Sequence, residues 1–289
     1  MLLVTGATGS FGKAAIDFLI KKNIPVAEIA ALARNEEKAK ELIERGIEVR
    51  LGDYDNYASL IKAFKGIDKL LFVAGSDIFD RGKQHVSIIN AAKESGVKHI
   101  FYTSFERNHE SESSPIAIIA KSHIDTDQNI KKSGLTYTIL RNGLYVDMLP
   151  MFMGEKVLET GVFLPAGEGK ASFTSRVDLA EAAVNILIGN GHENKEYVLT
   201  NVDNYSFDDV AKILSEISGK KVQYTSPSKE VYKETVLNAG VPAEYADIIT
   251  DFCESIKQGE FYTTKTDIQN ILGRKPMSLG EYLKSVYSS

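Results

Sequence analysis

The sequence predicts an α/β protein with a doubly wound parallel sheet and a smaller C-terminal α/β cap. In the first half of the chain, short apolar runs alternate with helical stretches, which is the order that builds such a sheet. The centres of these runs, such as 29–32 and 70–73, are almost continuously apolar, as in strands covered on both faces. A glycine-rich loop joins the first run to the first helix.

The composition is that of an ordinary globular protein. Of 289 residues, 43% are apolar and 25% are charged, and the net charge of −5 argues against a nucleic-acid partner. Cys253 is the only cysteine, so an internal disulfide or a thiolate metal cluster is excluded. The five histidines have no zinc-like spacing, so no metal site is expected.

Targeting and membrane signals are not expected. No apolar stretch reaches the roughly 18–20 residues that a spanning helix needs. The first predicted strand starts at residue 2 and leads directly into Gly6, which leaves no room for a signal peptide. We therefore expect a cytoplasmic protein without membrane insertion.

Strands and helices alternate in order along the first half. Strands are predicted at 2–7, 28–34, 48–52, 69–75, 99–104 and 137–142. Helices are predicted at 12–22, 36–45, 56–64 and 83–95, and glycines follow the last three closely, as is common at helix ends.

The second half changes character. Residues 154–172 are spaced by glycines and predict a hairpin or an excursion, and 176–188 predict a helix that begins near Ser175 and returns to the main sheet. A strand is predicted at 196–199. Ser206 and Asp209 have the spacing of a capping box that opens a helix, and a further helix, reaching residue 252, follows the break at 238–242.

The resulting domain prediction is interleaved. Residues 1–150, with 173–190 returning to them, form a dinucleotide-binding domain. Residues 151–172 and 191–289 form a smaller substrate-binding cap, and the substrate cleft is expected between the two.

The strongest chemical signal is the loop Val-Thr-Gly-Ala-Thr-Gly-Ser-Phe-Gly at residues 4–12. Gly6 permits a tight turn, Gly9 lets the backbone approach a pyrophosphate, and Gly12 lets the helix pack close to the strand. Free N–H groups at the helix start then bind the phosphates. This context predicts a Rossmann-like dinucleotide site whose loop residues are Gly6, Thr8, Gly9, Ser10, Phe11 and Gly12.

Arg34, at the end of the second predicted strand, indicates which dinucleotide is bound. An NAD site usually has an acidic residue there, whereas a guanidinium fits a 2′-phosphate. The sequence therefore favours NADP(H), and Lys38 would add positive charge one helical turn on. A solvated surface residue is the alternative for each.

Two further strand ends would border the cofactor. Asp53 and Tyr54 follow the third strand, where Asp53 accepts from the adenine or simply forms an Asx turn. Ala74, Gly75 and Ser76 follow the fourth strand and are small enough for the cofactor ribose to cross the sheet. Residues 77–84 would line the substrate.

These motifs resemble the NmrA-like branch of the atypical short-chain dehydrogenases. The resemblance rests on the 4–12 loop, Arg34, Gly-Asp-Tyr at 52–54, Val-Lys-His-Ile at 97–100 and Leu-Arg-Asn-Gly-Leu-Tyr at 140–145. It extends to 191–195 and 214–221, and so covers nearly the whole chain. Within the branch, the chain is similar to the bacterial type 2 NAD(P)H:quinone oxidoreductases and the triphenylmethane-dye reductases.

The usual acid of short-chain dehydrogenases is missing. Ser104 occupies the serine position of the family, but Ile119 and His123 stand where the Tyr-x-x-x-Lys pair would be. Lys121 is two residues out of register and points elsewhere on a helix. Ketone reduction, which needs a proton donor at the alkoxide, is therefore disfavoured.

Quinone reduction asks less of the protein, because water can protonate a delocalised hydroquinone anion and the site needs mainly to position the reactants. The resemblance implies that Leu140, Asn142, Gly143 and Tyr145 contact the nicotinamide side. The candidate catalytic residues are therefore the following: Asn142, His123, Ser104 and Tyr145. A histidine that only packs is an equal alternative for His123.

The favoured hypothesis is an NADPH-dependent oxidoreductase acting on a small aromatic or quinone-like substrate. The alternative is an NADP(H)-binding redox sensor that regulates a partner without turnover. The other four histidines are expected to be structural or on the surface, and Cys253 to be a buried small residue. The sequence leaves the oligomeric state open.

Overall fold

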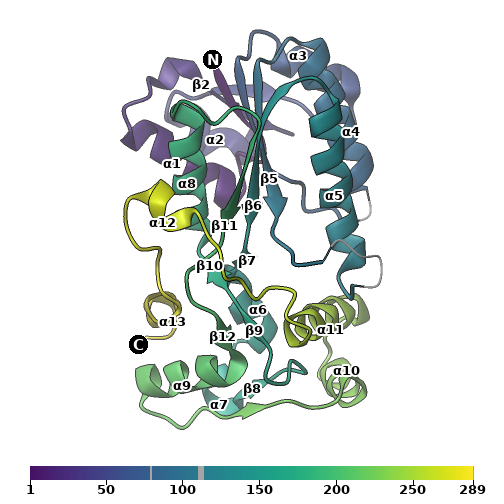
Figure 1. The fold of residues 1–289 in the computed structure, drawn as a ribbon, viewed down its shortest axis with the longest axis vertical. Coiled ribbons are helices and arrows are strands. Elements are labelled where there is room, and N and C mark those ends of the chain that lie inside the picture. Colours follow the sequence, from purple (N-terminus) through teal and green to yellow (C-terminus); the bar gives the residue numbers. More distant parts are fainter. Residues whose placement is uncertain (79, 110–113, 289) are drawn as a thin grey trace.

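The computed structural model describes residues 1–78, 80–109 and 114–288, and its centre is a seven-stranded parallel sheet (Figure 1). In spatial order the strands are β11 (Lys195–Leu199), β6 (Thr136–Asn142), β5 (His99–Phe105), β4 (Lys69–Phe72), β1 (Leu2–Val4), β2 (Ile29–Ala33) and β3 (Glu48–Leu51). The chain starts in the middle, at β1, and winds outward first on one side and then on the other. The predicted doubly wound α/β fold is confirmed.

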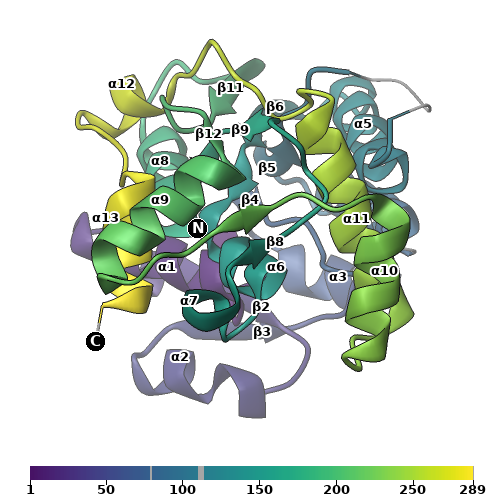
Figure 2. The same cartoon turned by 90° about the horizontal axis from the view of Figure 1, so that it is seen from below.

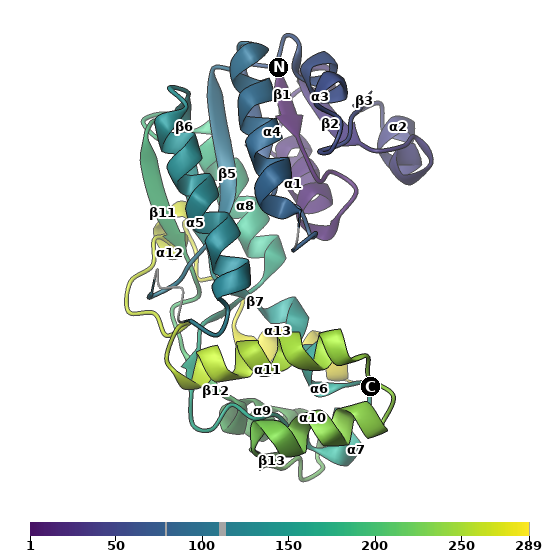
Figure 3. The same ribbon diagram turned by 90° about the vertical axis from the view of Figure 1, so that its right-hand side faces the viewer.

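Helices cover both faces of the sheet, as Figures 1 and 3 show from two sides. One face carries α1 (Ser10–Lys21), α2 (Lys40–Glu44), α8 (Arg176–Ile188) and α12 (Ile268–Leu272). The other carries α3 (Tyr57–Phe64), α4 (Arg81–Glu94) and α5 (Ala117–Lys132). The helices bury one apolar stripe each; in α1 it is Ala15, Ile16 and Leu19, which share one helical face.

A second group of elements lies beyond the carboxyl ends of the strands and has its own apolar core (Figures 2 and 3). Its helices are α6 (Leu149–Met153), α7 (Val157–Thr160), α9 (Phe207–Ser218), α10 (Lys229–Asn238), α11 (Ala243–Lys257) and α13 (Leu279–Tyr287). Its strands pair two by two: β7 (Leu144–Tyr145) with β10 (Phe173–Thr174), β8 (Val162–Phe163) with β13 (Tyr224–Thr225), and β9 (Lys170–Ala171) with β12 (Tyr205–Ser206). The described residues also form three short 3₁₀ turns: η1 (Val26–Glu28), η2 (Glu37–Ala39) and η3 (Val146–Met148).

Several local predictions are confirmed. Helix α8 starts after Ser175, whose hydroxyl oxygen accepts from the N–H of Val177, and the helix packs against α1. Ser206 and Asp209 form the predicted capping box of α9. Cys253 is fully buried within α11.

Other predictions need correction. The first strand ends at Val4, not at residue 7, because the chain turns at Gly6 with a φ of +58°. The helix predicted over 36–45 is divided into η2 and α2. Of the two alternatives predicted for residues 154–172, the excursion is confirmed and the hairpin is not, since β8 pairs with β13 and β9 with β12.

The cap boundary also differs from the prediction. Residues 195–199, assigned to the cap, form β11 and pair in parallel with β6 at the edge of the main sheet. Helix α12 lies against α8 and shares its apolar core. The chain therefore returns to the main sheet twice after β6, first for α8 and β11 and then for α12. Within the described ranges, every helix is too short or too polar to cross a membrane.

Candidate functional site

The candidate site lies at the carboxyl ends of β1, β4, β5 and β6, where the winding direction of the sheet reverses. Strand β1 pairs with β2 on one side and with β4 on the other. The loops after β1 and β4 lead to α1 and α4, which pack on opposite faces of the sheet. Open α/β sheets bind their ligands in the crevice at such a switch point.

The glycine loop after β1 is held in one shape by the backbone. The N–H of Gly9 donates to the carbonyl of Gly6 at 3.0 Å, which closes the turn. A Cβ on Gly12 would lie 2.3 Å from the Gly6 carbonyl oxygen, so only glycine allows α1 to pack this close to the loop. These contacts agree with the roles predicted for Gly6 and Gly12.

The first turn of α1 presents free donors. The first helical hydrogen bond runs from the N–H of Lys13 to the carbonyl of Gly9 at 2.9 Å, so the N–H groups of Ser10, Phe11 and Gly12 have no acceptor inside the helix. Gly9 is the N-cap and offers no side-chain cap. This end of α1 is therefore suited to an anion such as a pyrophosphate.

Two positively charged side chains, Arg34 and Lys38, lie on the segment that follows β2, the strand next to β1. Arg34 follows β2, is exposed, and makes no ion pair or hydrogen bond to a residue that the structure describes. The Lys38 side chain is exposed one turn later, while its backbone N–H donates to Asn35 Oδ1 at 2.9 Å. An exposed guanidinium at the end of β2 has the charge and the donor geometry to bind a 2′-phosphate.

The segment after β3 packs against the end of β4. Asp53 Oδ1 accepts from the N–H of Asp55 at 3.1 Å, which is the Asx turn weighed as an alternative to an adenine contact. The Tyr54 hydroxyl donates to the Val73 carbonyl at 3.2 Å, and its ring would lie 3.6 Å from a Cβ on Gly75. Tyr54 therefore borders the strand end where Gly75 and the exposed Ser76 follow.

The end of β4 is fixed by side chains from the neighbouring elements. The N–H of Ala74 donates to Thr103 Oγ1 at 2.9 Å, and the Gly75 N–H approaches His85 Nε2 at 3.4 Å. The Gly75 carbonyl accepts from Arg81 Nε at 2.8 Å. The backbone of Ala74 and Gly75, which is predicted to lie under the cofactor ribose, is therefore fixed by hydrogen bonds to β5 on one side and to α4 on the other.

A buried polar network lies between α4, β5 and α5, and His123 is its central member. His123 Nδ1 is 2.7 Å from the Tyr102 hydroxyl, and His123 Nε2 is 3.3 Å from Arg81 Nη1. His85 Nδ1 is 2.9 Å from Thr126 Oγ1. Sequence reasoning missed Arg81, Tyr102 and His85 as site residues. The sequence did contain a pattern that could have indicated two of them. In α4, the polar residues Arg81, Gln84 and His85 have the spacing of one helical face, and that face is buried.

Donor and acceptor balance fixes the histidine tautomers. Arginine can only donate, so His123 Nε2 accepts and a neutral His123 carries its proton on Nδ1, which donates to Tyr102. His85 likewise accepts at Nε2 from Gly75 and donates from Nδ1 to Thr126, whose own hydroxyl donates to the Ser122 carbonyl.

Burial and charge keep both rings neutral. Burial lowers the pKa of His123 well below its usual value, and the Arg81 charge lowers it further. Burial also lowers the pKa of His85 to about 3, again with help from Arg81. His123 is therefore a neutral acceptor for Arg81 at Nε2 and does not act as a cationic acid near neutral pH.

We expect this network to make the fold sensitive to acid. A histidine whose pKa is depressed in the folded state binds fewer protons than in the unfolded chain, so its contribution is present above pH ~6.5 and is lost as the pH falls toward about 3. The loss is about 1.4 kcal/mol per pH unit for one such group. Urea unfolding at pH 7, 6 and 5 measures it. His85→Gln should flatten the pH dependence, and an unchanged slope in that variant would contradict the assignment.

Ser104 is not available to a ligand. It is 3% exposed, and its hydroxyl donates to Asp127 Oδ2 at 3.0 Å. The same oxygen accepts from Arg107 Nη2 at 3.1 Å. Burial raises the pKa of Asp127, and the hydrogen bond from Ser104 and the charge of Arg107 act against that rise. The geometry gives Ser104 a structural role in a buried ion pair and does not support the predicted catalytic one.

The loop after β6 brings Asn142 and Tyr145 together, as predicted. Asn142 is 1% exposed, and neither polar atom of its amide has a hydrogen-bond partner among the described residues. Burial raises the pKa of the partly buried Tyr145, and the adjacent Asn142 and the charges of Arg176 and Arg81 oppose this rise. The Arg176 guanidinium lies 4.3 Å from the centre of the Tyr145 ring, which fixes its orientation.

Leu140 and Gly143 serve packing. The resemblance predicts Leu140 as a cofactor contact. Its side chain is instead fully buried in the core shared with α1 and α8 and is not available to a ligand. A Cβ on Gly143 would lie 3.0 Å from side-chain atoms of Thr174 and Thr200. Lys121 is exposed and pairs with Asp125 at 3.4 Å, away from His123, as expected.

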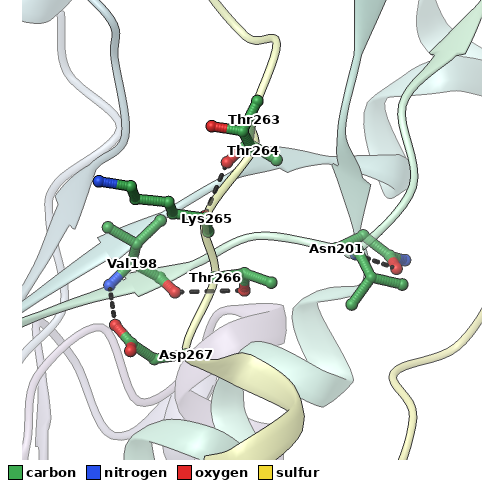
Figure 4. Close-up of a pocket in the computed structure, with 8 residues that line it drawn as sticks. Val198, Asn201, Thr263, Thr264, Lys265, Thr266 and Asp267 are labelled. Atoms are coloured by element: carbon green, nitrogen blue, oxygen red, sulfur yellow. Dashed lines mark hydrogen bonds between the residues drawn. The ribbon is translucent and has the colours of Figure 1, made fainter.

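One surface pocket lies away from all these residues. It is lined by Val198 at the end of β11, by 201–202 and by 263–267 (Figure 4). Asp267 Oδ2 accepts from the N–H of Val198 at 2.9 Å, and Thr266 Oγ1 donates to the Thr200 carbonyl at 2.6 Å. These bonds anchor the segment before α12 to the sheet. Among the described side chains, no group of three or more potential ligands is arranged to hold a metal ion.

Comparison with known proteins supports the same family. The model of the NmrA-like family matches residues 1–283. Quinone oxidoreductase 2 of Escherichia coli strain K12 is 34% identical over 289 residues, covering 100% of this chain and 99% of that protein.

Two crystal structures are similar over almost their whole length. Citrobacter sp. triphenylmethane reductase, complexed with NADP(H), is 40% identical with a TM-score of 0.91 and covers 99% of both chains. An NADPH-dependent quinone oxidoreductase from Escherichia coli, complexed with NADPH, is 32% identical with a TM-score of 0.90 and covers 100% of both chains. The predicted cofactor is thus the one bound in both similar structures. The chain belongs to the NmrA-like family.

Proposed function

We propose that this protein is an NADPH-dependent oxidoreductase that reduces quinones or similar conjugated, electron-poor acceptors. The observation that carries the proposal is the pairing of two features at one sheet edge. The free N–H groups at the start of α1 suit a pyrophosphate, and the exposed Arg34 beside them suits a 2′-phosphate. The bound dinucleotide would supply a hydride.

The proton donors at the site indicate which class of hydride acceptor the protein can reduce. The chain contains no Tyr-x-x-x-Lys sequence. His123, at the position of the lysine, is neutral, and its Nε2 atom is occupied by Arg81. An acceptor whose reduced form is a stabilised anion needs no strong acid beside it, because water completes the protonation. Ketones do not have this property, whereas quinones do.

The activities named for the relatives favour the same class. Quinone oxidoreductase 2, the triphenylmethane reductase and an NAD(P)H azoreductase from Xenophilus azovorans, 29% identical over 286 residues, act by name on conjugated acceptors. We propose that Tyr145 and residues 77–78 and 80–84 contact the acceptor; residue 79 of the predicted segment lies outside the described residues. We also propose that the second group of elements covers the acceptor and that the reaction is cytoplasmic.

The direct test is oxidation of NADPH, followed by its absorbance, with a panel of small benzoquinones and naphthoquinones. We expect turnover with quinones and none with isolated aliphatic ketones. Faster reduction of the ketones would contradict the proposed acceptor class.

The same experiment separates the enzyme from a sensor. If the protein binds NADPH tightly and reduces no acceptor of the panel, the enzymatic proposal fails. In that case a cofactor-sensing protein, which should bind NADP⁺ and NADPH with different affinities, becomes the better explanation.

A further inference from the structure

Arg81 is a cation in an unusual place. It is 7% exposed and is the first residue of α4, where a positive charge opposes the helix dipole. No carboxylate of the described residues lies within ion-pair distance of its guanidinium, although the more distant Asp77 favours the charge. A buried cation without an ion-pair partner is costly unless it serves an anion that binds later.

The remaining contacts of Arg81 orient it. Nε donates to the Gly75 carbonyl at 2.8 Å, and Nη1 donates to His123 Nε2 at 3.3 Å. Nη2 makes no hydrogen bond to a described residue, and the surrounding protein atoms do not enclose it completely. It therefore keeps donors that an outside group can reach.

The surroundings place this donor at the reaction end of the site. Arg81 contacts the end of β4 through Gly75 and α5 through His123, and its charge acts on Tyr145 after β6. The titratable groups that face it are the following: Tyr102, Tyr145, Asp77, His85 and His123.

We infer that Arg81 binds the acceptor oxygen on which negative charge develops during reduction, and that His123 is a positioning residue that holds Arg81 for this task. The inference rests on the proposed function for its acceptor. In the step, a hydride leaves the dihydronicotinamide, which is oxidised, and adds to the quinone, which is reduced. The displaced electron pair ends on a quinone oxygen next to Arg81, and a proton from water then neutralises it. Fixed donors aimed at such an oxygen are a main source of catalysis.

The first test measures binding without turnover. 4-Nitrophenol absorbs at different wavelengths as phenol and as phenolate, so titration in the presence of protein saturated with NADP⁺ reports which form is bound. We expect the intact protein to prefer phenolate by about tenfold or more, and Arg81→Met to lose this preference. Lys93→Met removes an exposed charge from the last turn of the same helix, outside the 77–84 segment, and should change nothing.

The second test separates Arg81 from cofactor binding. With a quinone, we expect Arg81→Met to lower kcat about 100-fold while the Kd for NADPH stays within about twofold. His123→Phe keeps the charge but removes its acceptor and should lower kcat by about tenfold. His123→Gln should largely restore it, since an amide can accept from Arg81 and donate to Tyr102.

Three outcomes decide the matter. Equal phenolate binding by the intact protein and Arg81→Met overturns the inference, and so does a loss of NADPH affinity above tenfold, which would make Arg81 a cofactor ligand. Phenolate preference that depends on Arg81 in a protein that reduces no quinone supports the anion site and refutes the proposed function. If Arg81→Met does not fold, Arg81→Lys and the two His123 variants still test the inference.

Discussion

Arg34→Ala is expected to weaken NADPH binding by about 10- to 100-fold and to leave NADH binding almost unchanged. The guanidinium is exposed and makes no bond to a described residue, so its removal costs the fold little. Two charge-assisted hydrogen bonds to a 2′-phosphate would account for a loss of this size, and NADH has no such phosphate. Calorimetric titration of both dinucleotides measures the difference.

The matched control is Lys40→Ala. Lys40 is also exposed, lies on the adjacent α2 and makes only a long contact of 3.9 Å with Glu44. It should alter neither affinity by more than twofold. Because exposed charges are screened, the Arg34 effect should shrink as salt is raised. Equal losses for NADPH and NADH in Arg34→Ala would remove Arg34 as the group that recognises the 2′-phosphate.

The main sheet could be predicted from the sequence because its determinants are local. Continuous apolar runs specify buried parallel strands, and the glycine loop and Ser175 mark where α1 and α8 begin. The partners of short strands were not predictable in this way. Val162 and Phe163 pair with β13, about sixty residues later, and nothing near them in sequence specifies this partner.

Site prediction from the sequence is limited for a related reason. Ser104 and His123 were chosen by position in the chain, but their roles depend on which groups fill the space beside them. Asp127 takes the hydroxyl of Ser104, and Arg81, on another helix, takes His123 Nε2. Residues whose backbone alone determines their role, such as Gly6 and Gly12, were predicted more reliably.

Gly9→Val is expected to reduce the affinity for NADPH and NADH alike by more than 100-fold while the protein stays folded. Gly9 has a φ of −87° and a ψ of 168°, an extended conformation that valine adopts readily. Its Cβ would meet only the Gly6 carbonyl oxygen, at 3.3 Å. The branched side chain would instead block access to the free N–H groups at the start of α1, where the pyrophosphate is proposed to bind.

A contrast with Gly12 makes this prediction sharp. At Gly12 a Cβ would lie 2.7 Å from Ala7 Cα as well as 2.3 Å from the Gly6 carbonyl oxygen, so Gly12→Val should prevent α1 from docking and destabilise the whole domain. Gly280→Val, in the first turn of α13 with open space around it, controls for a valine at a helix start. Thermal melting should separate Gly12→Val from the other two, and dinucleotide titration should separate Gly9→Val from Gly280→Val. Normal NADPH binding by a folded Gly9→Val protein would show that the pyrophosphate does not bind at the start of α1.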